Sequence, residues 1–309
     1  MVMQPGSWVT ETVRLKERIG RGGMAEVWRA EHVTLGTDVA VKYLPPQLAR
    51  RPGAVQRFLA EARMASQLSD PYTVRVLDCV VRREPDGDES AFIVMELLEG
   101  EDLKRHLERV GVLSLGATAS IVQQAAWALG TAHELGFIHR DVKPENIFLV
   151  SHCGRRYVKL LDFGVAKDRG AAQGITMIGV TLGTPQFMSP EQLEGARDLD
   201  ARCDVWALAV VAYECLTGIL PFEGKNVTAL ATAIHQRRVR PPSHLRGDLP
   251  ASIDHVFAKA FQLDIRHRFQ HARDLADALL DLGDGEHLAA RGVRKLVPSS
   301  RARVPEHVA

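Results

Sequence analysis

Residues near the amino terminus carry two features suited to holding phosphate. Between two expected strands lies the loop Gly20-Arg21-Gly22-Gly23-Met24-Ala25-Glu26-Val27. Glycines let a backbone approach a ligand closely, and successive N–H groups can cradle phosphate oxygens. Fifteen residues after Val27, Lys42 closes an apolar strand. Each feature alone is typical of a plain hairpin or a solvated charge, but together they predict a loop over phosphates with an ammonium beneath them.

One carboxylate lies where it could hold that ammonium. Residues 53–68 follow Pro52 and carry apolar side chains at helical spacing, and Glu61 belongs to this predicted helix. Arg57 and Ala65 flank Glu61 at the same spacing, a pattern that equally fits a carboxylate facing solvent. The residues themselves leave both interpretations open.

A second motif, His139-Arg140-Asp141-Val142-Lys143-Pro144-Glu145-Asn146, resembles the catalytic loop of protein kinases. A chance match at five positions of such a loop has an expectation of ~10⁻⁴ in a chain of this length. Leu161-Asp162-Phe163-Gly164 resembles the metal-binding turn of the same family, and it begins at a matching interval. The segment 183–191 and the tripeptide Asp204-Val205-Trp206 follow in the family's order. The resemblance covers residues 12–282.

This resemblance implies a site for ATP-dependent phosphoryl transfer to proteins. Asp141 would accept or orient the proton of the attacking hydroxyl, and Lys143 would neutralise charge on the γ-phosphate. Asn146 and Asp162 would supply hard oxygen ligands to Mg²⁺ or Mn²⁺. ATP and one of these metals are therefore the expected cofactors.

The nucleotide itself has an implied set of contacts. Lys42, held by Glu61, would bind the α- and β-phosphates, and Met95 would be the gatekeeper behind the adenine. The Glu96 carbonyl and the Leu98 amide would bind the adenine edge through the backbone, leaving their side chains free to vary. The full implied set is Gly20, Arg21, Gly22, Gly23, Met24, Ala25, Val27, Ala40, Lys42, Met95, Glu96 and Leu98. Alanine at position 25 replaces the third loop glycine of the family, a mild departure.

Other matched residues have structural roles by the same resemblance. His139 and Phe163 would pack in the core that joins two lobes. Asp204 would accept N–H bonds from the catalytic loop, where a helix dipole also favours a carboxylate. Glu191 and Arg268 would form a buried ion pair that holds the substrate-docking segment.

Residues 166–183 correspond to the activation segment of the family. Thr176 and Thr181 are candidate sites of autophosphorylation, or else ordinary polar residues of a loop. Arg140 offers a guanidinium to a phosphothreonine, which would order the segment. Thr184 would hydrogen-bond the aspartate and lysine of the catalytic loop.

The subgroup can also be inferred. Gly22-Gly23-Met24 in the first loop, and Ser189-Pro190-Glu191 in place of Ala-Pro-Glu, resemble the bacterial, eukaryotic-like serine/threonine kinases. Lys143, two residues after Asp141, favours serine or threonine over tyrosine as the acceptor.

Positioning these residues requires a strand-rich half followed by a helical half. Strands are expected at Ala25–Ala30, Asp38–Tyr43 and Ala91–Leu97. Helices are expected at 53–68, 117–135, 201–217 and 272–282, with Gly283 ending the last. The fold class is α+β, the bilobal protein-kinase fold, with a small antiparallel β-sheet lobe containing one helix and a larger, mainly α-helical lobe. The expected divisions are an extension at 1–11, an N-lobe at 12–98, a C-lobe at 99–282 and a basic, weakly ordered tail at 283–309.

Composition excludes several other classes. The net charge of +1 gives no general attraction to nucleic acid, and 46% apolar residues exclude a mainly disordered chain. The most apolar stretch, Val205–Leu220, is too short to span a bilayer. Four widely separated cysteines (Cys79, Cys153, Cys203 and Cys215) indicate a reducing cytoplasm rather than a disulfide framework.

The expected partners are protein substrates with serine or threonine acceptors, and a transient homodimer would allow autophosphorylation. Two rival functions differ in class. One is a catalytically silent scaffold, which the intact motifs argue against. The other is a small-molecule kinase of the aminoglycoside type, which would lack the peptide platform of residues 183–191. The tail is expected to be a solvated end, and the alternative is a juxtamembrane segment of a longer receptor-like protein.

Overall fold

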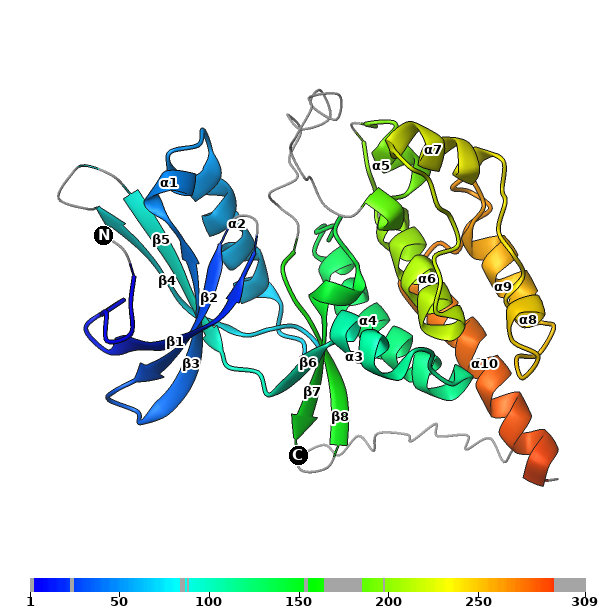
Figure 1. The fold of residues 1–309 in the computed structure, drawn as a ribbon, viewed down its shortest axis with the longest axis horizontal. Coiled ribbons are helices and arrows are strands. Elements are labelled where there is room, and N and C mark those ends of the chain that lie inside the picture. Colours follow the sequence, from blue (N-terminus) through cyan, green and yellow to red (C-terminus); the bar gives the residue numbers. More distant parts are fainter. Residues whose placement is uncertain are drawn as a thin grey trace, which may run out of the picture.

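The computed structural model describes residues 3–22, 25–83, 87, 89–152, 155–163, 185–196 and 198–291. Its amino-terminal part is a five-stranded antiparallel sheet in the order β1-β2-β3-β5-β4 (Figure 1). The strands are β1 (Val13–Arg21), β2 (Glu26–His32), β3 (Thr37–Leu44), β4 (Val76–Arg83) and β5 (Glu89–Glu96). The three strands expected from the sequence correspond to β2, β3 and β5.

The alternation of side chains along β3 decides which residues reach the functional face of this sheet. Val39, Val41 and Tyr43 point into one core, which the segment preceding β1 also covers. The intervening positions Lys42 and Leu44 face helix α2 (Ala54–Gln67), and Leu44 joins a second core there. Helix α2 agrees with the expected 53–68, and the short helix α1 (Pro46–Ala49) precedes it.

A second sheet, of order β6-β7-β8, follows the first, and it was not expected from the sequence. Its strands are β6 (Gly100–Asp102), β7 (Ile147–His152) and β8 (Arg155–Leu160). Gly100 has φ of +147°, and a Cβ there would lie 2.0 Å from the carbonyl oxygen of Leu149. Only glycine allows the chain leaving the first sheet to approach β7 this closely.

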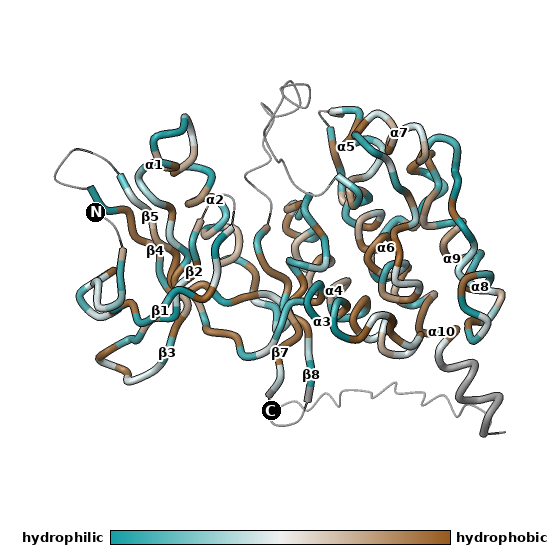
Figure 2. Tube along the Cα trace, in the orientation of Figure 1, coloured by the Kyte–Doolittle hydropathy of each residue, from teal (hydrophilic) through white to brown (hydrophobic). Residues whose placement is uncertain are grey.

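The remaining part is helical, with α6 (Arg202–Thr217) at its centre. Residues Cys203–Leu216 of α6 are all buried, and Figure 2 shows hydrophobic residues along it. Such a helix must be enclosed by other elements. The helices around it are α3 (Leu103–Val110), α4 (Leu115–Glu134), α5 (Pro190–Leu193), α7 (Val227–His235), α8 (Pro242–Leu245), α9 (Ile253–Ala260) and α10 (Ala272–Arg291).

The last helix is longer than expected from the sequence. Helix α10 does not end at Gly283 but continues to Arg291. A glycine ends a helix when it adopts a left-handed backbone, as Gly136 does after α4 and Gly218 does after α6. Gly283 keeps the helical conformation, and a Cβ there would lie 3.9 Å from the Cα of Gly116 in α4. Within the described ranges, no helix combines the length and apolarity needed to cross a bilayer.

Candidate active site

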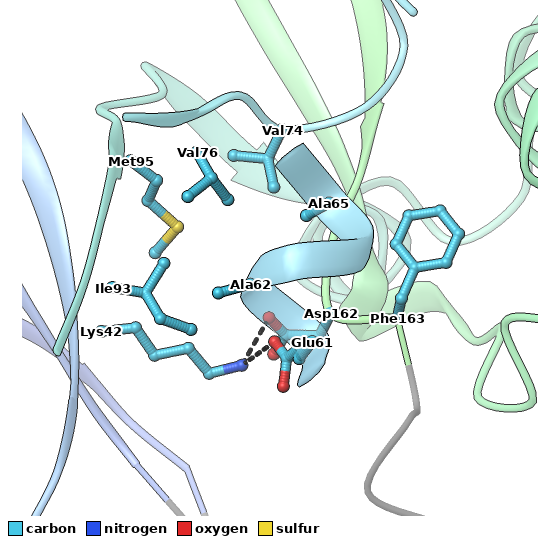
Figure 3. A pocket seen from close by; sticks show the side chains of 10 residues that line it. All are labelled: Lys42, Glu61, Ala62, Ala65, Val74, Val76, Ile93, Met95, Asp162 and Phe163. Atoms are coloured by element: carbon cyan, nitrogen blue, oxygen red, sulfur yellow. Dashed lines mark hydrogen bonds and ion pairs between the residues drawn. The ribbon is translucent and has the colours of Figure 1, made fainter. Parts of the chain in front are cut away.

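Three charged residues from distant segments meet beside α2 (Figure 3). The Nζ of Lys42 lies 2.6 Å from Oε1 of Glu61 and 2.7 Å from Oδ1 of Asp162. The Lys42 and Glu61 side chains are mostly buried, whereas that of Asp162 is half exposed. The Lys42–Glu61 pair that the sequence left undecided is therefore formed.

The electrostatics of this cluster follow from two carboxylates sharing one ammonium. Burial raises the pKa of Glu61 to about 7, because the opposing effect of Lys42 does not fully offset desolvation and the charge of Asp162. For Asp162, desolvation is outweighed by the Lys42 ammonium, which lowers the pKa of this carboxyl. Lys42 has a raised pKa despite its burial, because both carboxylates favour its charged form. The ammonium and the Asp162 carboxylate are thus both ionised at neutral pH.

The catalytic-loop residues form a second cluster, organised around Asp141. Nζ of Lys143 lies 3.0 Å from Oδ2 of Asp141. The 3-10 turn η1 (Pro144–Asn146) brings Asn146 back toward the same residue, where its Nδ2 donates to the Asp141 carbonyl at 2.8 Å. Lys143 and Asn146 of the predicted motif therefore both contact Asp141.

A buried carboxylate on α6 holds the backbone of this loop. Asp204 accepts hydrogen bonds of 2.8 Å from the amides of His139 and Arg140, and its Oδ2 also lies 2.8 Å from Nε2 of His133. Arg140 has φ of +62°, a left-handed conformation that costs energy for a residue with a side chain. The expected contact between Asp204 and the catalytic loop is confirmed, and it stabilises this strained turn.

His139 connects the two clusters. Its Nε2 donates to the carbonyl of Leu161 at 2.9 Å, and its ring packs on Phe163 with centroids 4.7 Å apart. Burial lowers the pKa of His139, so the imidazole is neutral. A neutral imidazole carries one N–H group, and here that group donates to the Leu161 carbonyl. The His139 and Phe163 side chains are both buried, so their predicted place in the core is confirmed, and their mutual contact fixes the segment carrying Asp162 (φ +49°) to the catalytic loop.

The strand register brings the expected nucleotide-binding residues of β2, β3 and β5 next to one another. Val27 pairs with Lys42, and Ala40 pairs with Met95. Met95 lines a small cavity together with Lys42 and apolar side chains of α2, β4 and β5, which Figure 3 displays. In the first loop, Gly20 and Arg21 end β1, and the amide of Gly22 donates to the Ala25 carbonyl at 2.8 Å. Gly23 and Met24 lie outside the described residues.

One expectation about the adenine edge is wrong. The Glu96 side chain is not free to vary, because its Oε1 lies 2.7 Å from Nζ of Lys159 and accepts the Arg75 amide at 2.8 Å. The sequence carries no signal for Lys159, since its contact with Glu96 joins residues far apart in the chain. Leu98 lies between β5 and β6.

The ion pair expected near the substrate-docking segment is also present. Arg268 is fully buried, and its Nη1 and Nη2 lie 2.8 and 3.2 Å from the two oxygens of Glu191. The two expected phosphorylation sites, Thr176 and Thr181, lie outside the described residues, as does Thr184.

Asn146 and Asp162 are the residues that would hold Mg²⁺. The Asn146 amino group is used by Asp141, so its carbonyl oxygen is the atom that it offers, and the Asp162 carboxylate is half exposed. Across the described ranges, no three His, Cys, Asp or Glu side chains form a metal cage. Mg²⁺ bound with a nucleotide needs only one or two protein oxygens, since phosphates and water complete its shell. These residues therefore fit a metal that arrives with a nucleotide.

Comparisons with known proteins agree with this geometry. The family model described as "Protein kinase domain" matches residues 13–286. The chain is 39% identical over 284 residues to the serine/threonine-protein kinase Pkn1 of Myxococcus xanthus, covering 91% of this chain and 40% of that protein. It is 38% identical over 266 residues to PknA of Mycobacterium tuberculosis, covering 86% of this chain and 60% of PknA.

Solved structures show the same likeness. The PknI kinase domain of Mycobacterium tuberculosis superimposes with a TM-score of 0.71 at 28% identity, covering 92% of this chain and all of that one. The chain spans less than half the length of the first curated relatives that it matches.

Proposed function

This chain belongs to the protein kinase domain family, and from that membership we propose that it transfers the γ-phosphate of ATP to serine and threonine hydroxyls of proteins in bacterial signalling. Its curated relatives carry the names of bacterial serine/threonine kinases. The observation that supports the proposal most strongly is the cluster of Lys42, Glu61 and Asp162, which brings an ammonium and a metal-binding carboxylate together from separate segments.

In the proposed reaction, the hydroxyl oxygen of the acceptor forms a bond to the γ-phosphorus while the bond from that phosphorus to the β,γ-bridging oxygen breaks. Asp141 takes the hydroxyl proton, and Lys143, 3.0 Å from Asp141, neutralises charge on the transferred group. Lys42 holds the α- and β-phosphates. Mg²⁺, when bound by Asp162 and Asn146, would supply further charge neutralisation. No covalent enzyme intermediate is needed.

The proposal extends to activation. Autophosphorylation of Thr176 or Thr181 would place a phosphate in reach of Arg140, whose Nε is buried without a hydrogen-bond partner among the described residues. A transient homodimer would let one copy modify another. Intact-mass analysis after incubation with ATP and Mg²⁺ tests this step, and full activity without phosphate on either threonine would end it.

A cytoplasmic location completes the proposal. The buried, unpaired thiols of Cys203 and Cys215 support it, because they suit a reducing compartment.

The deciding experiment compares acceptors. The wild type is incubated with ATP, Mg²⁺ and either protein or aminoglycoside substrates, and Asp141→Asn is the matched control. We expect label on protein, itself included, and a loss of about 10³-fold in Asp141→Asn. Label on the small molecule alone would favour the aminoglycoside-type kinase, and no label on any acceptor would favour the scaffold.

A further inference from the structure

A buried ammonium outside the catalytic clusters connects the two sheets. Lys159, on β8, is only 8% exposed, and its Nζ donates to Oε1 of Glu96 at 2.7 Å and to the Thr73 carbonyl at 2.9 Å. Glu96 is the last residue of β5 in the first sheet. A single cation of the second sheet therefore binds both the end of β5 and the loop between α2 and β4.

Glu96 is held from a second direction by that same loop. Its amide donates to the Arg75 carbonyl at 3.0 Å, while its Oε1 accepts the Arg75 amide at 2.8 Å. The loop is itself fixed to β8, because the Leu160 amide donates to the Tyr72 carbonyl at 2.7 Å. The backbone of Glu96 is consequently restrained by its neighbours in both sheets.

Stability alone is a poor explanation for such a pair. The Lys159 side chain is 10% exposed and the Glu96 side chain is 24% exposed. Replacing a largely buried ion pair by apolar residues of similar size is often neutral or stabilising, and in some proteins such a pair is retained because it fixes geometry. The residue that this pair fixes is the one whose carbonyl would face the adenine. Moreover, β8 continues within three residues to Asp162, so the same contact sets the base-binding backbone relative to the phosphate end of the site.

We propose that Lys159 and Glu96 are positioning residues, which fix the backbone at the end of β5 for recognition of the adenine edge. This inference rests on the proposed function, because it assumes that a nucleotide binds between Lys42 and the end of β5.

ATP and GTP provide the test, since they share their phosphates and differ at the base edge that the backbone would read. We compare the wild type with the double variant Lys159→Met/Glu96→Leu, which leaves no unpaired buried charge. The expected result is a fall of about tenfold in the ratio of kcat/KM for ATP to kcat/KM for GTP. Lys259→Met, which removes an exposed lysine from α9, serves as the control and is expected to keep the ratio.

A purely structural role would change the activities with both nucleotides together, so an unchanged ratio in the double variant would overturn the inference. If the double variant does not fold, Glu96→Gln preserves size and removes the charge, and we expect a smaller fall in the same ratio. Thermal shifts by ATP and GTP measure base preference without catalysis. Absence of phosphate transfer by the wild type would thus contradict the proposed function, while the thermal shifts would still decide the positioning role.

Discussion

Lys42 is the residue on which the site converges, because it contacts a carboxylate from α2 and another from the segment after β8. The balance among these three charges depends on the proton of Glu61. Above its pKa of about 7, Glu61 is ionised and holds the ammonium, and below that value it is protonated and holds it weakly.

Protonation of Glu61 is expected to have opposite effects on ATP affinity and on the free energy of unfolding. As the pH falls from about 8 to about 6, ATP affinity should fall, because the Lys42–Glu61 pair weakens. The free energy of unfolding should change the other way. A carboxyl whose folded pKa is raised favours the folded state at low pH, so its contribution is lost as the pH rises from 4.5 through about 7. Calorimetric titration with ATP and urea unfolding at several pH values measure both trends.

Glu61→Gln is the control for that prediction. It should flatten both trends between pH 6 and 8, since no proton then binds at this position. Persistence of the full pH dependence in Glu61→Gln would assign it to another group.

At the residue scale, which charged residues of the candidate site would come together was predictable, and one set of contacts was not. The motifs around Asp141 and Asp162 are contiguous in sequence, so they can be found without coordinates. The bond between Lys159 and Glu96 joins residues of different sheets and has no spacing signal. The interpretation that the Glu96 side chain varies freely failed for this reason.

At the scale of elements, the amino-terminal turn of α6 supports the catalytic loop through Asp204. Asp204→Asn keeps one side-chain carbonyl oxygen as an acceptor. It removes the carboxylate charge that binds the amides of His139 and Arg140 and the side chain of His133. We expect a loss of about 2 kcal/mol in unfolding free energy, together with a marked fall in kcat, because Arg140 can then leave its left-handed conformation. Asp200→Asn, at a partly exposed aspartate before the same helix, should leave kcat nearly unchanged.

The contact between α5 and the segment before α10 leads to a prediction about stability. Arg268→Met leaves Glu191 without its partner and removes the bonds to the carbonyls of Gln262 and Arg202. Breaking a buried pair costs about 3–5 kcal/mol, and urea unfolding should report a loss of this size. Arg266→Met removes an exposed arginine two residues earlier, and the unfolding midpoint should then hardly change. Equal midpoints for the two variants would contradict the role given to Arg268.

Helices with strong apolar periodicity were predictable, and elements defined by pairing were not. The bounds of α2, α4 and α6 agree with their patterns to within about two residues. The second sheet was missed because β6 has only three residues and pairs with β7 across a long interval. The end of α10 was misplaced because Gly283 keeps the helical conformation instead of the left-handed one that ends a helix.

At the scale of the whole molecule, the five-stranded sheet and the helical part have separate hydrophobic cores. A nucleotide that contacts both parts should stabilise them together. At an ATP concentration of about 100 Kd with Mg²⁺, the stabilisation is about 2.7 kcal/mol, which corresponds to a rise in Tm of roughly 5 °C. Differential scanning fluorimetry measures this shift, and EDTA should remove most of it. A shift that survives EDTA in full would contradict the assignment of Asn146 and Asp162 to a metal.

The most direct test of the account is phosphoamino acid analysis of protein labelled from γ-labelled ATP in the presence of Mg²⁺. We expect phosphoserine and phosphothreonine without phosphotyrosine, and almost no label when Asp141→Asn replaces the wild type. Equal labelling by the Asp141→Asn variant, or phosphotyrosine as the main product, would contradict it.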